Sequence, residues 1–445
     1  MHGAFSGKRT WNDARSIALC IPLILILTLS GHALALPGDP DTTFSNNGIS
    51  HHLMGSGSNP LQGTPGSVAI QANGKIVTAG QVSSGTKERF AVARYETTGD
   101  LDLSFSGDGK VQTKFGPLSG ATSVAIQNNQ KIVVAGWKVS GSQTRFALAR
   151  YKINGHLDLN FGVNGNGKVT TPIGVNSGAT SVAIQPDQKI VVTGNARVGG
   201  DDGFAVARYQ TNGDLDTSFD NDGKVHTPIG VYAYATSAAI QIDGKIVVAG
   251  MASTTPSNSR FALARYEPIN GGLDTSFGNG GTVTISFPGS PSNAGANSVA
   301  IQNDGMIVAA GYSGSGSNSR FALVRYDPVA GSLDTNFDTD GRVITNMGAY
   351  SYAASVAIQL GSGGEIVAVG SGIQANNGIF AVVRYDPVAG ALDTSFGTGG
   401  KVKTLIGNTS YATAVAIQPG DSKLVVAGGT SVANKNRFAV ARYDD

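Results

Sequence analysis

Seven aromatic side chains lie in predicted loops rich in Ser, Asn and Gly, and they are the best candidates for ligand binding. Exposed rings beside hydroxyl and amide groups suit the recognition of a sugar or of a protein surface, because the ring offers an apolar face and its neighbours supply hydrogen bonds. The alternative is that the rings only cover the ends of hydrophobic cores. The seven residues are Trp137, Tyr232, Tyr234, Tyr312, Tyr350, Tyr352 and Tyr411.

Acidic turns offer a second kind of chemistry, the binding of Ca²⁺. Residues 220–223 and 338–341 place oxygen-bearing side chains at alternate positions, as calcium loops do, but neither segment has the downstream glutamate of an EF-hand. Equivalent turns elsewhere hold only Gly, Asn and Thr, so we interpret the carboxylates as turn residues and expect no metal and no cofactor. The alternative is calcium at Asp220, Asp222, Asp338 and Asp340.

Two other patterns resemble functional sites only in part. Residues 162–169 come close to a phosphate-binding P-loop, but Val169 stands where Ser or Thr must bind Mg²⁺, and a strand rather than a helix is predicted to follow. His51 and His52 are adjacent, so a strand would direct them to opposite faces and away from a shared metal. No Ser-His-Asp or Cys-His set stands out, which leaves no obvious nucleophile.

These candidates all lie within a sequence unit of about 58 residues that recurs seven times. An Asp…Phe element, an Arg-Tyr pair and a run ending in Gln recur in step, and self-similarity at a fixed period is typical of repeat architectures. With 62 Gly and 14% charged residues, the composition disfavours long helices and disorder. The marker phenylalanines are Phe44, Phe105, Phe161, Phe219, Phe277, Phe337 and Phe396.

Each unit predicts four strands and no helix. In the third unit the strands are expected at residues 181–185, 189–194, 204–209 and 224–228, separated by Gly/Asp turns. Short strands repeated with this period favour an all-β, seven-bladed β-propeller with four antiparallel strands per blade. Alanines in the Gln-ending run indicate that this strand is innermost, where crowding favours small side chains.

The phase of the repeat predicts how the ring closes. The last unit stops at Tyr443 without an outer strand, whereas residues 48–54 read as an outer strand without a unit. We expect this N-terminal strand to complete the last blade, against residues 414–443, and so to remove two exposed sheet edges.

Residues that recur in every unit point to the scaffold, because a single site does not need seven copies. The Arg of the Arg-Tyr pair and the Asp before Phe are the main case. We predict that Arg208 and Asp216, and their counterparts, form hydrogen-bonded pairs within or between blades.

The motifs Leu-Asp-Thr-Ser-Phe, Ser-Val-Ala-Ile-Gln, Lys-Ile-Val-Val-Ala-Gly and Arg-Phe-Ala-Leu-Ala-Arg-Tyr together resemble the bacterial delta-60 repeat, a propeller-type repeat of exported proteins. The resemblance covers about residues 36–445. It implies a β-propeller in a bacterial, surface or secreted context. It implies no activity and assigns no functional residue.

The N-terminus has the form of a secretion signal. Lys8, Arg9 and Arg15 precede an apolar run that ends before a small-x-small sequence, so we predict a signal peptide at residues 1–35 and a propeller domain at residues 36–445. The run is about 13 residues long, shorter than the roughly 20 of a transmembrane helix, so a retained anchor is the alternative and the mature chain is predicted to have no membrane span.

The mature chain carries 29 basic and 29 acidic residues and no cysteine. This balance offers no electrostatic footprint for nucleic acid, so nucleic acid is not an expected partner. We predict a binding or scaffold module for protein or carbohydrate, located in the bacterial periplasm, at the cell surface or outside the cell. The alternative is an enzyme of the lyase, hydrolase or quinoprotein type with its site at the mouth of the central axis.

Overall fold

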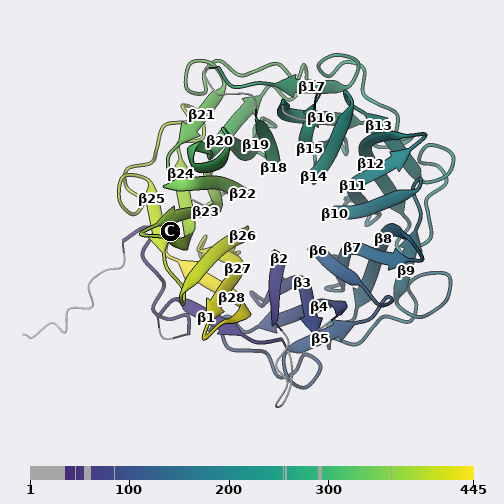
Figure 1. The fold of residues 1–445 in the computed structure, drawn as a ribbon, viewed down its shortest axis with the longest axis horizontal. Helices are drawn as coiled ribbons and strands as arrows, with labels where there is room; N and C mark the ends of the chain where they lie inside the picture. The colour runs from purple at the N-terminus through teal and green to yellow at the C-terminus, as the bar shows by residue number, and fades with distance from the viewer. Residues whose placement is uncertain are drawn as a thin grey trace, which may run out of the picture. The chain divides into compact units, whose positions relative to one another are not determined.

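The chain forms seven four-stranded sheets arranged around a central axis, as the ribbon in Figure 1 shows. This computed structural model describes residues 36–445 except residues 46, 55–61, 85, 254, 256–257, 289–292 and 362. The predicted signal peptide, residues 1–35, lies outside the described residues. The seven-bladed β-propeller predicted from the repeat is therefore confirmed.

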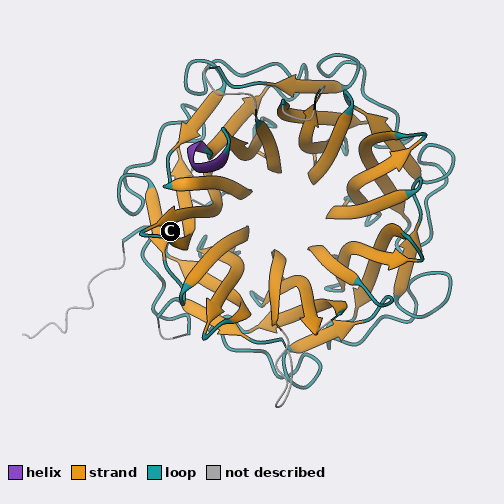
Figure 2. Cartoon of the chain, viewed as in Figure 1, coloured by secondary structure: helices purple, strands orange, loops and turns teal. Residues whose placement is uncertain are grey.

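The strands of each blade follow the chain outward from the axis (Figures 1 and 2). The inner strands are β2 (Gln62–Ile70), β6 (Ser119–Ile126), β10 (Asn176–Ile184), β14 (Tyr232–Ile240), β18 (Ala294–Ile301), β22 (Ala349–Gln359) and β26 (Thr409–Ile417). The second strands are β3 (Ile76–Ser84), β7 (Ile132–Ser140), β11 (Ile190–Val198), β15 (Ile246–Ser253), β19 (Ile307–Ser313), β23 (Glu365–Gln374) and β27 (Leu424–Val432). The third strands are β4 (Lys87–Tyr95), β8 (Gln143–Tyr151), β12 (Asp201–Tyr209), β16 (Ser259–Tyr266), β20 (Arg320–Tyr326), β24 (Asn377–Tyr385) and β28 (Lys435–Tyr443). The outer strands are β5 (Lys110–Thr113), β9 (Lys168–Thr171), β13 (Lys224–Pro228), β17 (Thr282–Ile285), β21 (Arg342–Thr345), β25 (Lys401–Thr404) and β1 (Ile49–His52).

We number the blades in chain order, so that blade 1 is β2–β5, blade 2 is β6–β9, and blades 3 to 6 follow in the same way. Blade 7 combines β26–β28 with the N-terminal strand β1. In Figure 1, β1 (purple) lies beside β28 (yellow), and the two strands pair antiparallel from Ile49 opposite Ala441 to His52 opposite Phe438. The predicted closure of the ring by the N-terminal strand is confirmed.

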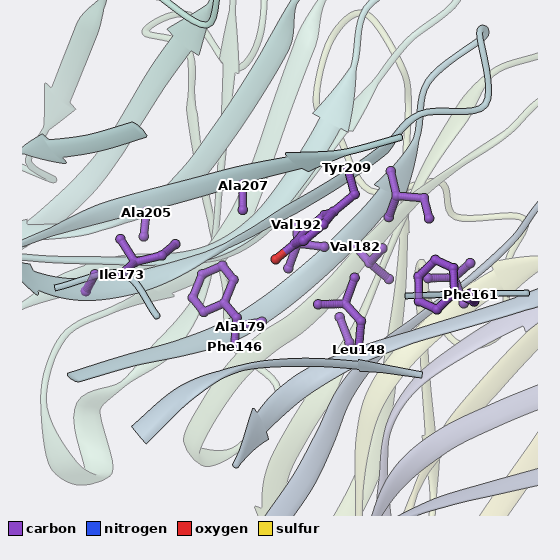
Figure 3. Close-up of a cluster of buried hydrophobic side chains, with 14 residues drawn as sticks. Phe146, Leu148, Phe161, Ile173, Ala179, Val182, Val192, Ala205, Ala207 and Tyr209 are labelled. Carbon is purple, nitrogen blue, oxygen red and sulfur yellow. The ribbon is translucent and has the colours of Figure 1, made fainter. Parts of the chain in front are cut away.

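The hydrophobic core lies between neighbouring blades. Figure 3 shows one such cluster, in which Phe146 and Leu148 of blade 2 face Ala205, Ala207 and Tyr209 of blade 3. The third strands read Phe-Ala-Val or Phe-Ala-Leu followed by Ala or Val, because both of their faces are buried, one against each neighbouring blade.

Polar bonds join the blades as well. The Tyr209 hydroxyl lies 2.7 Å from the hydroxyl of Thr171 in the preceding blade, and burial raises the Tyr209 pKa.

Each inner strand contains a β-bulge about halfway along. In blade 4 the pairing register shifts between Ala235 and Ser237, which leaves Thr236 as the extra residue. The Thr236 hydroxyl donates to the carbonyl of Ala249 at 3.0 Å and to the carbonyl of Ala296 in blade 5 at 2.9 Å. The strand continues beyond the bulge, and in blade 4 this extension carries Tyr232 and Tyr234.

The described part of the chain contains one short 3₁₀ helix, η1 (Gly316–Asn318), drawn in purple in Figure 2. It belongs to the loop between β19 and β20 and lies beside β22. Within the residues that the structure covers, no helix has the length and hydropathy needed to cross a membrane.

Candidate functional site

One end of every blade is built by residues that recur in all seven units. Arg208 donates from Nε to Asp216 Oδ2 at 2.7 Å, and its guanidinium carbon lies 4.5 Å from the centroid of the Phe219 ring. Its Nη1 donates to the carbonyl of Pro268 in the next blade. The predicted pairing is thus confirmed in each blade, through Arg94–Asp102, Arg150–Asp158, Arg208–Asp216, Arg265–Asp274, Arg325–Asp334, Arg384–Asp393 and Arg442–Asp41.

The electrostatics of this end keep the carboxylates charged. Burial alone would raise the pKa of Asp216, but hydrogen bonds from Ser218 and Lys189 and the charge of Arg208 lower it to about 2. Lys189 Nζ lies 3.1 Å from Asp216 Oδ2. Arg208 in this charged, buried network bonds both its own blade and the next one, so the network positions the blades.

The opposite end of the blades varies from unit to unit. Here, on the far side of each bulge, one residue of the inner strand lies directly opposite one residue of the second strand, and we call these two residues the variable pair. Their types differ in nearly every blade, whereas the residue before the second-strand member is Gly in all seven. In blade order the pairs are Thr64–Gln81, Gly120–Trp137, Gly178–Asn195, Tyr234–Met251, Gly295–Tyr312, Tyr352–Ser371 and Tyr411–Gly429.

A pocket of about 590 Å³ opens at this variable end, between blades 4 and 5. Three of the predicted binding residues, Tyr232, Tyr234 and Tyr312, line it together. Among the described residues, tyrosine is the only titratable residue type on the lining. We call this site the aromatic pocket; its lining is Tyr232, Tyr234, Met251, Ser253, Ser259, Asn293, Tyr312, Gly314, Ser315, Gly316 and Ser319.

The strands explain how these tyrosines come to lie together. Tyr232 and Tyr234 are two residues apart on β14 and therefore point to the same face of the strand. Tyr312 lies on β19 opposite Gly295, where a Cβ atom would come within 3.1 Å of Tyr312 Cε1 and 3.3 Å of Met251 Cβ. The missing side chain of Gly295 thus gives the Tyr312 ring room beside Met251.

The loop that carries η1 forms another wall of the pocket and is tied to blade 6. The Ser319 hydroxyl donates to the carbonyl of Ser351 on β22 at 3.0 Å, and the Ser351 backbone N–H donates to the carbonyl of Ser319 at 3.1 Å. These bonds hold the small polar residues of the loop against the tyrosines, so the wall of the pocket is preformed.

The other four predicted aromatic residues lie outside the aromatic pocket. Tyr352 and Tyr411 lie in neighbouring blades: burial raises the pKa of Tyr411, a hydrogen bond with Thr64 lowers it, and the nearby phenol of Tyr352 raises it further. Tyr350 is 53% exposed and sits in a second irregularity of β22 with a φ of 51°. Trp137 is partly buried over Gly120.

At the variable end, the inner and second strands extend further than we expected from the sequence. The aromatic residues were expected in loops, just before the inner strands and just after the second strands, but all seven lie within strands. For the inner strands the bulge accounts for the difference, because it interrupts the alternation of side chains without ending the strand.

In the acidic turns, Asp222 and Asp340 bond residues of the same turn. Asp222 accepts the backbone N–H of Lys224 at 2.9 Å and pairs with Lys224 Nζ at 2.9 Å. Asp340 pairs in the same way with Arg342, at 3.1 Å. Asp220 and Asp338 adopt positive φ angles of 50° and 48° in these turns. No group of three or more His, Cys, Asp or Glu side chains suited to a metal occurs among the described residues.

Sequence reasoning missed the polar and sulfur-bearing residues of the aromatic pocket. Met251, Ser253 and Asn293 lie on its lining but belong to no recognisable motif. A usable signal was present for one of them: Met251 occupies the same place in its unit as Trp137 and Tyr312, which were selected as aromatic residues.

The chain belongs to a family of β-propeller repeat proteins. A sequence profile of the family described as "Domain of unknown function (DUF5122) beta-propeller" matches the chain once in every unit, and the matches together make up more than half of the chain. They cover residues 71–105, 127–161, 185–219, 241–277, 302–337, 363–396 and 420–444. A comparison with curated protein sequences gave no match.

Several solved structures share the architecture. The extracellular domain of BT4673 from B. thetaiotaomicron is 14% identical with a TM-score of 0.43, and the alignment covers 89% of this chain but only 40% of that one. Chaetomium thermophilum Sqt1 bound to the N-terminus of the ribosomal protein L10 is 9% identical (TM-score 0.48, covering 86% and 97% of the two chains). The polysaccharide lyase Uly1 is also 9% identical (TM-score 0.47, covering 85% and 90%). These values describe a resemblance of architecture only.

Proposed function

We propose that this chain is an exported binding module of delta-60-type repeats that holds a neutral carbohydrate, or alternatively a protein segment, in the aromatic pocket. The single observation that carries the proposal is the lining of that pocket. Tyr232, Tyr234 and Tyr312 share one cavity with serine hydroxyls, and none of the described residues on its lining is Asp, Glu, His, Lys or Arg.

The chemistry of this lining favours binding over catalysis. Tyrosine rings offer apolar faces against which the C–H face of a sugar or an apolar side chain packs, and their hydroxyls remain available for hydrogen bonds. Serine hydroxyls both donate and accept, which matches the hydroxyl groups of a saccharide. A volume of about 590 Å³ lies within the range of small-ligand pockets.

The place of binding is proposed to be outside the cytoplasm, in the periplasm, at the cell surface or beyond it. The support is the predicted signal peptide at residues 1–35 and the absence of cysteine from residues 36–445. A chain without disulfides must be stabilised by burial alone, and the seven interblade cores provide that burial.

The proposal is tested by screening the purified protein against an array of neutral oligosaccharides and an array of synthetic peptides. We expect wild-type protein to bind a saccharide, and the Tyr234→Ala/Tyr312→Ala variant to lose about tenfold or more in affinity, since both rings leave the pocket. The matched control is Tyr350→Ala, which removes an exposed ring outside the pocket. Retention of full affinity by the double variant would refute the proposal.

A further inference from the structure

Blade 2 departs from the repeat at its outer strand. Lys168, the first residue of β9, follows Phe161 by seven positions, whereas the equivalent spacing is five in the other six blades. The two extra residues enlarge the turn at residues 162–167, the segment that resembles a P-loop. Because Lys168 begins a strand and not a helix, the structure confirms that the segment is not a P-loop. Insertions into single repeats often build binding sites.

The enlarged turn forms one wall of a second pocket, of about 400 Å³, on the outer side of blade 2. Lys114, Lys138 and Lys168 line it, and we call it the lysine pocket. Lys168 Nζ donates to the carbonyl of Lys114 at 3.3 Å and lies 5.8 Å from the centroid of the Phe115 ring. These contacts hold the Lys168 ammonium beside the backbone of Lys114 and the ring of Phe115, which belong to a separate segment of the lining.

The positive charge of Lys168 is not neutralised as it is at the equivalent position in three other blades. The basic residue that begins the outer strand pairs with the carboxylate two positions earlier in three other blades, through Lys110–Asp108, Lys224–Asp222 and Arg342–Asp340. In blade 2 this carboxylate is replaced by Asn166, whose Oδ1 accepts the Lys168 backbone N–H at 3.0 Å but carries no charge. The substitution keeps the turn and removes its counter-charge.

The remaining charges on the lining leave an excess of cations. Within the residues that the structure covers, neither Lys114, Lys138 nor Lys168 forms an ion pair within 4.0 Å. One carboxylate, Asp214, lies on the lining and is bound by the Asn212 amide at 2.7 Å. The lining therefore holds three lysines and one aspartate, in a chain whose acidic and basic residues otherwise nearly balance.

We propose that the lysine pocket binds an oxyanion, carried either by an acidic saccharide or by a free inorganic ion. Lysine ammonium groups attract carboxylate, sulfate and phosphate oxygens as point charges. The side-chain amides of Asn164 and Asn166 and the hydroxyl of Thr170, which lie on the same lining, supply further donors. This proposal does not depend on the aromatic pocket, which lies in other blades and has a neutral lining.

The test is calorimetric titration of the purified protein with sodium sulfate, sodium phosphate, trigalacturonate and the neutral maltotriose. We expect at least one of the three anions to bind with a dissociation constant of about 1 mM or tighter, and the affinity to fall as ionic strength rises. Binding of the inorganic ions identifies a free-oxyanion site, whereas binding of trigalacturonate alone identifies an acidic-saccharide site; both support the proposal.

Two variants separate the lysine pocket from general surface charge. Lys114→Gln/Lys168→Gln is expected to weaken binding of the anion about tenfold, because two of the three ammonium groups are lost. Lys224→Gln is the matched control, since Lys224 holds the same place in blade 3 but is paired with Asp222. The proposal is overturned if none of the anions binds at about 10 mM, if the double variant binds unchanged, or if Lys224→Gln weakens binding equally.

Discussion

At the scale of single residues, the recurring arginine connects each blade to the next. Arg208 is 2% exposed, pairs with Asp216 in its own blade and donates to a carbonyl of the next blade. In the last blade Arg442 donates to the carbonyl of Thr97 at 2.7 Å and so links blade 7 to blade 1. The bonds of each guanidinium to the carboxylate and to the carbonyl replace the hydrogen bonds to water that it loses on burial. They also join two sheets that share no backbone pairing.

Removal of one such arginine leaves a buried carboxylate without its main partner. We predict that Arg208→Ala lowers the free energy of unfolding by about 3–5 kcal/mol, measured by chemical denaturation. Arg260→Ala, at a partly buried position near the start of the neighbouring β16, serves as the control and should cost far less. A loss below about 1 kcal/mol for Arg208→Ala would show that the pair is not a buried ion pair in solution.

At the scale of elements, the strand β1 decides whether the ring is closed. The N-terminal segment that ends in β1 brings the last blade both its outer strand and Asp41, the partner of Arg442 and Lys423. His52 of β1 packs against the Tyr95 ring in blade 1 at 5.8 Å between centroids. Burial, followed by the positive charges of His51 and Lys110, lowers the pKa of His52 to about 4, despite the opposing charge of Asp100.

This lowered pKa predicts that closure weakens in mild acid. The unfolded chain binds a proton at His52 below about pH 6.5 and the folded chain only below about pH 4, so stability is highest above pH 6.5 and falls as the pH drops from 6.5 to 4. We expect a loss of about 1–3 kcal/mol over this window, measured by urea denaturation at several pH values.

His52→Gln should reduce this pH dependence, because the titrating group is removed from β1. The control His156→Gln alters an exposed histidine in blade 2 and should leave the dependence as it is. An unchanged pH profile for His52→Gln would contradict the role assigned to this residue.

The sequence predicted the strands and their order more completely than it predicted the residues that share the aromatic pocket. Repeats with the alternation of Ser-Val-Ala-Ile-Gln predict strands and their order, because burial between blades imposes the same pattern seven times. The aromatic pocket was predictable only as a set of tyrosines at one end. Which of them share a cavity depends on Gly295 opposite Tyr312 and on the loop anchored by Ser319, and neither contact follows a period. The lysine pocket was missed because an insertion of two residues breaks the repeat.

At the scale of the whole molecule, the two ends of the blades differ: one holds the recurring contacts between blades, and the other holds the variable pairs. One end repeats its Arg, Asp and Phe in every blade and joins the ring. The other end changes its variable pair from blade to blade, and the aromatic pocket opens there. Side chains at the variable end can therefore differ from blade to blade without altering the recurring contacts that join the blades.

The most direct test of this division measures ligand affinity and the free energy of unfolding on the same two variants. For Tyr234→Ala/Tyr312→Ala we predict a loss of about tenfold or more in affinity for the saccharide selected on the array, with unfolding changed by no more than about 1.5 kcal/mol. For Arg208→Ala we predict the reverse, a loss of about 3–5 kcal/mol in stability with affinity within about twofold under conditions where the variant is folded. Unchanged affinity in the tyrosine variant, or an equal loss of affinity in folded Arg208→Ala, would contradict the account.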